Sequence, residues 1–257
     1  MNVIVSKTKL VSSRIIMILV TWVVTLILTQ IGYAETLFFD DFNSGKISNA
    51  YKFTANGKWE VKNGSLHQTN PASTDSCHAV IFDQKYPDEI TIQTKLRVND
   101  WSSGDYARTG IGVRVDPDKG EGYDFLFSDY RASKPNSVVA FLNDHVAWGP
   151  AVKYEWEINT WYWMQLHIDK SGHLQAKVWL DGKVEPKDWT AEIDENGFSG
   201  ARATGYPSLC GESGGGGGTC IVEFDSVEVW DSGGSTHKLA VDAYGKLVNT
   251  WAEIKVQ

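Results

Sequence analysis

The sequence has few cysteines, which can form disulfides, and few prolines, which interrupt helices and strands. It has only three cysteines, three methionines and seven prolines among 257 residues. So few cysteines exclude a small scaffold held by many disulfides. No cysteine and histidine share the short spacing of a zinc motif, so the sequence predicts no zinc site.

Basic residues are also in deficit, because 24 Lys and Arg face 32 Asp and Glu and give a formal net charge of −8. An acidic chain is repelled by nucleic acid and by anionic membrane surfaces. We therefore expect no nucleic-acid partner and favour a neutral ligand or calcium.

Helical periodicity is missing from positions 36–231. Short alternating or apolar runs recur there between turn residues, which is typical of strands. The clearest hairpin is Lys58–Thr69, where Asn63 and Gly64 suit a two-residue type I′ turn. Further predicted strands are Glu89–Val98, Thr109–Asp116, Gly122–Asp129, Ser137–Asp144, Thr160–Asp169, Leu174–Gly182 and Ile221–Trp230. About ten strands with one apolar face each predict an all-β fold of two packed antiparallel sheets over residues 35–231.

The amino-terminal residues resemble an export signal. Three basic residues precede the apolar run Ile15–Ile31, and small residues stand before a cut after Ala34. This layout predicts a signal peptide that forms a helix, over residues 1–34, and a secreted, extracellular or periplasmic protein without membrane contact after cleavage. The alternative is an uncleaved anchor, since the run is close to the length that spans a bilayer.

The carboxyl-terminal residues 232–257 read as a linker and an amphipathic tail. Apolar residues from Tyr244 to Ile254 fall at helical spacing, which predicts a short helix. We expect it to dock on the sandwich or on a protein partner.

Two of the cysteines flank a glycine-rich loop. Cys210 and Cys220 enclose GESGGGGGT, which lets the chain turn freely and allows a disulfide in an oxidising compartment. The alternative is three free, buried thiols. In either case Cys77 is expected to be buried.

Several segments together resemble the concanavalin A-like lectin/glucanase superfamily, particularly its laminin-G-like and 3-keto-disaccharide-hydrolase-like branches. The segments are FFDDFNSG (Phe38–Gly45), TGIGVRVD with GYDFLF in mid-chain, Asn159–Trp189, and VEFDSVEVW at the end. Each is weak alone, and their order and spacing carry the resemblance. It implies a jelly-roll sandwich with one concave sheet that often holds sugars.

The last predicted strand carries E-x-D-x-x-E, formed by Glu223, Asp225 and Glu228. A β-bulge near Ser226 would place its four apolar neighbours in the core and all three carboxylates on the outer face. Laminarinase-type glycoside hydrolases use this spacing for catalysis, so a catalytic role is one alternative. In those enzymes, however, the motif lies mid-chain.

A closing strand in such sandwiches usually pairs with the opening one. The resemblance then implies a structural calcium ion between them, held by Asp41 and Asp225. Calcium prefers oxygen ligands of this kind. Plain solvated carboxylates are the alternative.

Five residues are candidates for sugar binding, since sugars need flat apolar surfaces and paired donors and acceptors. Trp101 and Trp148 fall in predicted loops. Arg114 alternates with glycines on one strand face, and Tyr123 and Asp129 lie on the neighbouring strand. The alternatives are a hydrophobic lid for the tryptophans and a surface ion pair for Arg114.

These features predict a secreted, non-catalytic carbohydrate-binding sandwich that recognises extracellular glycan on a concave face. One alternative is a glycoside hydrolase of the laminarinase-like or 3-keto-disaccharide-hydrolase-like kind. Another is a structural or adhesion module that uses the tail.

Overall fold

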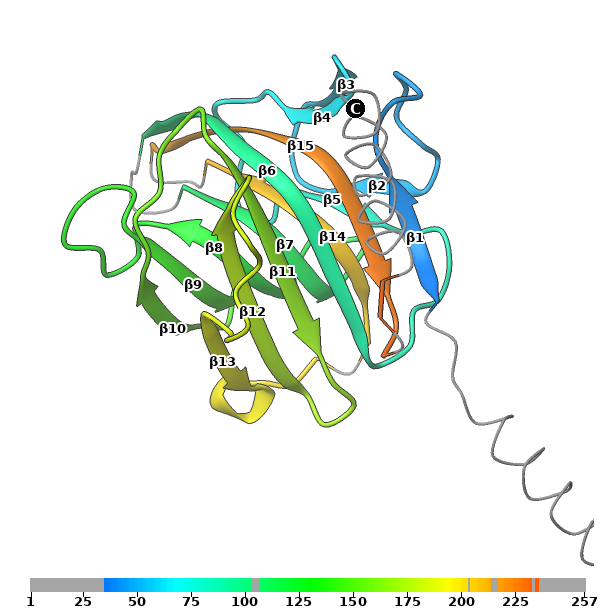
Figure 1. Ribbon diagram of the computed structural model, residues 1–257, viewed down its shortest axis with the longest axis vertical. Coiled ribbons are helices and arrows are strands. Elements are labelled where there is room, and N and C mark those ends of the chain that lie inside the picture. The colour runs from blue at the N-terminus through cyan, green and yellow to red at the C-terminus, as the bar shows by residue number, and fades with distance from the viewer. Residues whose placement is uncertain (1–34, 103–106, 203, 214–216, 233, 236–257) are drawn as a thin grey trace, which may run out of the picture. The chain divides into compact units, whose positions relative to one another are not determined.

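The computed structural model describes residues 35–102, 107–202, 204–213, 217–232 and 234–235. They form two antiparallel sheets packed as a sandwich (Figure 1). The strands are β1 (Thr36–Asp40), β2 (Tyr51–Phe53), β3 (Trp59–Lys62), β4 (Ser65–Gln68), β5 (His78–Ile81), β6 (Ile90–Ser102), β7 (Arg108–Val115), β8 (Tyr123–Ser128), β9 (Val138–Asn143), β10 (Ala147–Lys153), β11 (Trp161–Ile168), β12 (His173–Leu180), β13 (Ala191–Asp194), β14 (Tyr206–Glu212) and β15 (Thr219–Trp230), with one short 3₁₀ helix, η1 (Glu195–Gly197). The predicted all-β class is confirmed.

The eight-stranded sheet runs β13-β12-β11-β6-β15-β4-β3, with β1 paired to β15 beside this path. The seven-stranded sheet runs β10-β9-β8-β7-β14-β5-β2. Strands distant in sequence therefore become neighbours, as β5 and β14 do. No helix among the described residues has the length and apolar character needed to cross a bilayer.

Two local predictions are confirmed by the backbone. Asn63 and Gly64 both have positive φ, 54° and 77°, and join β3 to β4 as the hairpin turn requires. The opening strand β1 pairs with the closing strand β15, with Asp40 opposite Val227.

The expected bulge also forms, because the register between β15 and β6 shifts between Phe224 and Ser226. The shift carries Val222, Phe224, Val227 and Val229 into the core, where each is at most 1% exposed. Burial of this apolar strand face fixes the register, since a slip of one residue would expose all four side chains.

The core lies between the two sheets. Its members include Ile90, Ile92, Leu96 and Val98 of β6 and the phenylalanines of β8 and β9. We call the side of each sheet that turns away from the core its outward face.

Two sequence-based expectations are wrong, and two others fall on residues that the structure does not describe. Trp101 and Trp148 are in strands β6 and β10 rather than in loops. The expected disulfide between Cys210 and Cys220 is wrong, because all three cysteines are free. Cys220 faces the core, whereas Cys210 packs with Leu126 and Leu142, both from the outward face of the seven-stranded sheet. The expected signal peptide (1–34) and tail helix lie outside the described residues.

Candidate functional site

The outward face of the seven-stranded sheet carries a buried polar cluster. Ile111 of β7 faces the core, so by alternation Arg108, Gly110 and Gly112 face outward. A Cβ at Gly112 would lie 2.3 Å from an Asp124 oxygen and 2.7 Å from Ser208 Oγ, so only glycine leaves room for these groups. The members of the cluster are His78, Arg108, Asp124, Asp144, Ser208, Cys210 and Glu212, all at most 4% exposed.

The segment Ser73–Ser76 reaches this polar cluster from the loop before β5. Ser76 Oγ donates a hydrogen bond to Asp144 Oδ2 at 2.5 Å, and the Asp75 carboxylate lies 3.5 Å from Arg108 Nη2. Ser73 Oγ bonds Gly211 O and Ser213 Oγ at the end of β14. The segment therefore ties β14 to the end of β9 and contributes to the burial of the cluster.

Arg108 is the central cation of this cluster. Its Nη2 lies 3.1 Å from Asp144 Oδ1, and its Nε forms an ion pair with Glu212 Oε2. Burial alone would lower the pKa of Arg108, but the Glu212 and Asp144 charges outweigh it and raise the pKa. The guanidinium therefore stays charged and neutralises the carboxylates around it.

Deeper in the cluster, His78 and Asp124 titrate abnormally. Burial raises the pKa of Asp124 to about 7, against the opposing influence of His78. Burial also acts to lower the pKa of His78, yet the nearby Asp124 charge and the contact with Glu212 raise it overall. Strong perturbation of buried groups is typical of functional sites as well as of structural ion pairs.

A pocket of about 220 Å³ opens above Arg108. It is lined by Asp75, Arg108, Leu142, Asp144, His145, Val146, Ala147 and Trp148. The half-buried Trp148 ring stacks on Tyr130 with centroids 4.1 Å apart and planes at 11°, and the Arg108 guanidinium carbon lies 5.9 Å from the Trp148 centroid. An apolar ring thus stands beside hydrogen-bonding and charged groups, the combination that sugar rings require.

Two other pockets lie near the 204–206 segment. One of about 360 Å³ is lined by Lys85, Tyr86, Asp116, Pro117, Thr204, Gly205 and Tyr206. The other, of about 20 Å³, has room for one water molecule beside Arg114. Neither contains a buried charged pair comparable to Arg108 and Asp144.

Among the five sugar-binding candidates from the sequence, only Trp148 lines the 220 Å³ pocket. Arg114 has φ of +51°, and the register between β7 and β14 shifts beside it, so the alternation of β7 is interrupted at this residue. Its Nη1 donates to Glu195 Oε2 at 2.7 Å, and Tyr123 Oη lies 3.4 Å from the same oxygen. Arg114 and Tyr123 thus fasten the 3₁₀ helix η1 to the end of the sandwich.

Trp101 and Asp129 contact each other and line none of the three pockets described above. Trp101 Nε1 donates to Asp129 Oδ2 at 3.0 Å, and its ring packs edge-on against Trp156 at 4.9 Å. Asp129 Oδ1 also accepts a hydrogen bond from the Asn136 backbone. The geometry agrees with the lid alternative for Trp101.

The three carboxylates of the last strand lie on the outward face of the eight-stranded sheet and line none of these pockets. Glu223 forms an ion pair with Arg97 and lies 3.5 Å from His67 Nε2. Glu228 accepts hydrogen bonds at 2.7 Å from Thr36 Oγ1 and Ser235 Oγ. Both carboxylates are therefore already held by neighbours.

The two residues expected to hold calcium make different contacts. Asp225 lies 3.6 Å from Lys95 Nζ, whereas Asp41 accepts hydrogen bonds from the backbone and side chain of Asn43. The calcium site at Asp41 and Asp225 stays a prediction.

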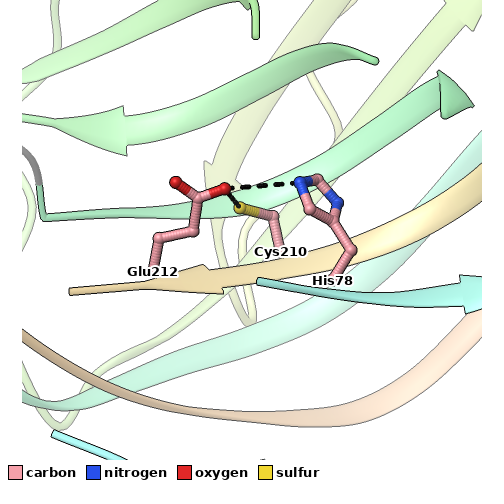
Figure 2. Close-up of side chains that lie close together, drawn as sticks. All are labelled: His78, Cys210 and Glu212. Carbon is pink, nitrogen blue, oxygen red and sulfur yellow. Dashed lines mark hydrogen bonds and ion pairs between the residues drawn. The ribbon is translucent and has the colours of Figure 1, made fainter. Parts of the chain in front are cut away.

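One group of the described residues has the donor atoms and proximity to bind a transition metal. His78, Cys210 and Glu212 offer a nitrogen, a sulfur and an oxygen that all lie within 4.8 Å of one another (Figure 2). Sequence spacing missed this group because His78 and Cys210 meet only through the pairing of β5 with β14.

One sequence signal could have identified Arg108. It lies two residues before Gly110 and four before Gly112, so strict alternation along β7 predicts that it shares their face, as it does for Arg114. By contrast, no local signal marks Asp144 or Glu212, which are recruited by long-range pairing.

Comparison with known proteins identifies the fold. No family model and no curated protein matches the chain. Two solved structures share 15% identity: the GH43 BlXynB protein from Bacillus licheniformis (TM-score 0.54) and Bacteroides ovatus xyloglucan PUL GH43B (TM-score 0.53), each covering 76% of this chain and 39% of that chain. The Ca²⁺-bound exoplasmic/lumenal domain of VIP36 has a TM-score of 0.53 at 10% identity, covering 75% of this chain and 88% of that domain.

The chain thus spans about two-fifths of the length of the GH43 proteins it matches. Identities this low establish a shared β-sandwich and nothing finer.

Proposed function

We propose that the protein is an exported, non-catalytic carbohydrate-binding sandwich whose ligand site is the 220 Å³ pocket on the outward face of the seven-stranded sheet. The observation that carries the proposal is the meeting of the Trp148–Tyr130 stack with the buried Arg108–Asp144 pair in one pocket. The aromatic face would hold the C–H face of a sugar ring, while Arg108, Asp144 and His145 would bond its hydroxyls.

The size and charge of the pocket restrict the kinds of sugar that it can bind. Its volume is below the roughly 300–1,000 Å³ of ordinary small-molecule sites, so it fits one sugar ring at the end of a glycan better than an internal stretch of chain. Asp75 and Asp144 on its wall disfavour anionic sugars, as does the net charge of −8. A neutral terminal sugar or an amino sugar fits best.

The structural neighbours support glycan recognition as a class. One VIP36 structure with the same fold, at a TM-score of 0.53, is described as its Ca²⁺/Man3GlcNAc-bound form. Calcium at Asp41 and Asp225 belongs to this proposal as a separate, structural role, since the pocket does not contain either residue.

A glycan array followed by calorimetry on the purified full chain tests the proposal. Trp148→Ala should abolish measurable binding, because it removes the apolar face of the pocket. Trp163→Ala is the matched control: this half-buried Trp also stacks on an aromatic, Trp179, but on the other sheet. It should bind as the parent does.

Two outcomes would overturn the assignment. One is the absence of binding to any glycan at millimolar sugar with calcium present. The other is loss of binding in Tyr206→Ala but not in Trp148→Ala, which would move the site to the 360 Å³ pocket. Export is tested separately by sequencing the amino terminus of the secreted protein, which should begin at Glu35.

A further inference from the structure

Three members of the polar cluster, His78 on β5 and Cys210 and Glu212 on β14, carry atoms that can bind a metal ion. Cys210 lies directly opposite His78 in the strand pairing, and Glu212 is two residues further along β14, so all three side chains project from the same face. Figure 2 shows one oxygen of the Glu212 carboxylate turned toward both the His78 imidazole and the Cys210 thiol. The arrangement is built by the sheet itself and does not depend on a loop.

The distances suit a tetrahedral ion. Glu212 Oε1 lies 3.3 Å from His78 Nε2 and 3.4 Å from Cys210 Sγ. Zinc bound at ordinary bond lengths separates its nitrogen and oxygen ligands by about 3.3 Å, and its sulfur and oxygen ligands by about 3.6 Å. The observed separations are close to both values.

A second, independent observation is Asp124. Its carboxylate is fully buried, and neither oxygen accepts a hydrogen bond from any residue that the structure describes. Oδ2 lies 4.0 Å from His78 Nε2, on the same outward face. A buried carboxylate without hydrogen bonds is costly, so a cation at this point would remove the cost.

The neighbouring groups are those expected around a metal ligand. His78 Nδ1 makes a 2.9 Å hydrogen bond with Ser208 Oγ, which fixes the ring and leaves Nε2 turned toward Glu212. Nε2 itself makes no hydrogen bond of good geometry within the described part of the chain. Arg108 holds the other Glu212 oxygen, Oε2.

We propose that His78, Cys210 and Glu212 bind one divalent transition-metal ion, with Asp124 as the fourth ligand, and that Zn²⁺ is the ion best suited to this mixed set. Imidazole, thiolate and carboxylate together favour zinc over calcium or magnesium, which take oxygen ligands alone. Binding replaces the Cys210 S–H proton by the metal, and the proton leaves to solvent.

The site is closed, because all four ligands are fully buried. Four protein ligands without an open position are typical of structural zinc. The ion would therefore stabilise the seven-stranded sheet beneath the pocket and would not act on a substrate. Arg108, which contacts both Glu212 and the pocket residue Asp144, separates the ion from the pocket.

The test uses the purified full chain, refolded in the presence of Zn²⁺ or Co²⁺ and passed through a desalting column. We expect about one ion per chain by elemental analysis. With Co²⁺ we expect the visible bands of a tetrahedral site and a thiolate-to-metal charge-transfer band. Zn²⁺ should also raise the melting temperature.

Matched variants separate this site from adventitious binding. Cys210→Ser should lose the charge-transfer band, while Cys220→Ser, an equally buried thiol that faces the core, should keep it. Ser208→Ala should retain the band but weaken Zn²⁺ binding by about 10- to 100-fold, because His78 loses its orienting partner. If Cys210→Ser does not fold, Glu212→Gln should retain less Zn²⁺ than the parent chain, because it removes the carboxylate ligand.

The proposal is overturned if the refolded parent chain retains no Zn²⁺ or Co²⁺. It is also overturned if Cys210→Ser and Cys220→Ser retain the ion and the charge-transfer band equally.

Discussion

The outward faces of the two sheets both carry carboxylates, but they neutralise them differently. On the eight-stranded sheet, Glu223 is paired with Arg97, whose side chain is 33% exposed, and Asp225 faces Lys95 in a half-exposed pair. On the seven-stranded sheet, Arg108 is 5% exposed and the carboxylate of Asp124 has no hydrogen bond from the described residues.

This difference shows that a recognisable sequence motif on one sheet need not be a functional site, whereas a cluster without a motif on the other sheet can be one. E-x-D-x-x-E is conspicuous in the sequence, yet each of its carboxylates is already held by a cation or by hydroxyl groups. The cluster around Arg108 has no sequence motif, but it combines burial, excess negative charge and a neighbouring pocket. Unsatisfied buried charge is the stronger indication of function.

The largest expected effect is on stability, in Arg108→Met. The substitution leaves Glu212 and Asp144 buried without their cation and should lower the free energy of unfolding by about 3–5 kcal/mol. Arg97→Met is the matched change on the other sheet and should cost about 1–2 kcal/mol, because Arg97 is partly exposed and the buried Glu223 keeps His67 Nε2 at 3.5 Å. Urea unfolding measures both. Equal losses of unfolding free energy in the two variants would contradict the proposed difference between the two outward faces.

The next effect is on glycan affinity. Asp144→Asn removes the charge that holds Arg108 and Ser76 at the pocket, and should weaken the binding found on the array by about tenfold, or about 1.4 kcal/mol. Glu223→Gln should bind as the parent does. Calorimetry gives the affinities, and a reducing-sugar assay on the same samples should detect no cleavage. Cleavage by the parent that is lost in Glu223→Gln would instead establish the glycoside-hydrolase alternative.

Sequence pattern predicted the sandwich because alternation and turn chemistry are local. The Asn63-Gly64 hairpin and the bulge beside Ser226 both follow from residues a few positions apart, and the structure confirms them. Arg114 shows where this reasoning stops. Positive φ is uncommon for a non-glycine residue, and at Arg114 it interrupts the alternation on which the prediction rested.

The buried polar cluster could not be predicted from the sequence for a different reason. His78 and Cys210 are brought together by β5 and β14, two strands that the sequence did not predict. Their register depends on the packing of the whole sheet, so no spacing along the chain encodes it. The sequence predicts Trp148 as a ligand residue, but it predicts a loop where the structure has strand β10.

A smaller effect is expected from Asp225→Asn. The carboxylate is 44% exposed and pairs with Lys95 at 3.6 Å, so its loss should change the free energy of unfolding by less than about 0.5 kcal/mol. Melting curves with calcium and with a chelator check this. A calcium-dependent rise in melting temperature that disappears in both Asp225→Asn and Asp41→Asn would contradict it and support the structural calcium ion.

The smallest effect concerns His173, at the exposed end of β12. Its hydrogen bond with Asp194 raises its pKa, burial opposes this, and Glu192 also raises the pKa. Because the folded pKa exceeds the unfolded value, the contribution is complete below the unfolded pKa and is lost as pH rises through the folded pKa. NMR titration should therefore give a pKa above 6.5. His173→Gln should lose stability at pH about 5.5 and match the parent at pH about 8.5. Solvent screens this network, so the loss at pH about 5.5 should be small. An equal loss at pH about 8.5 would contradict the raised pKa of His173.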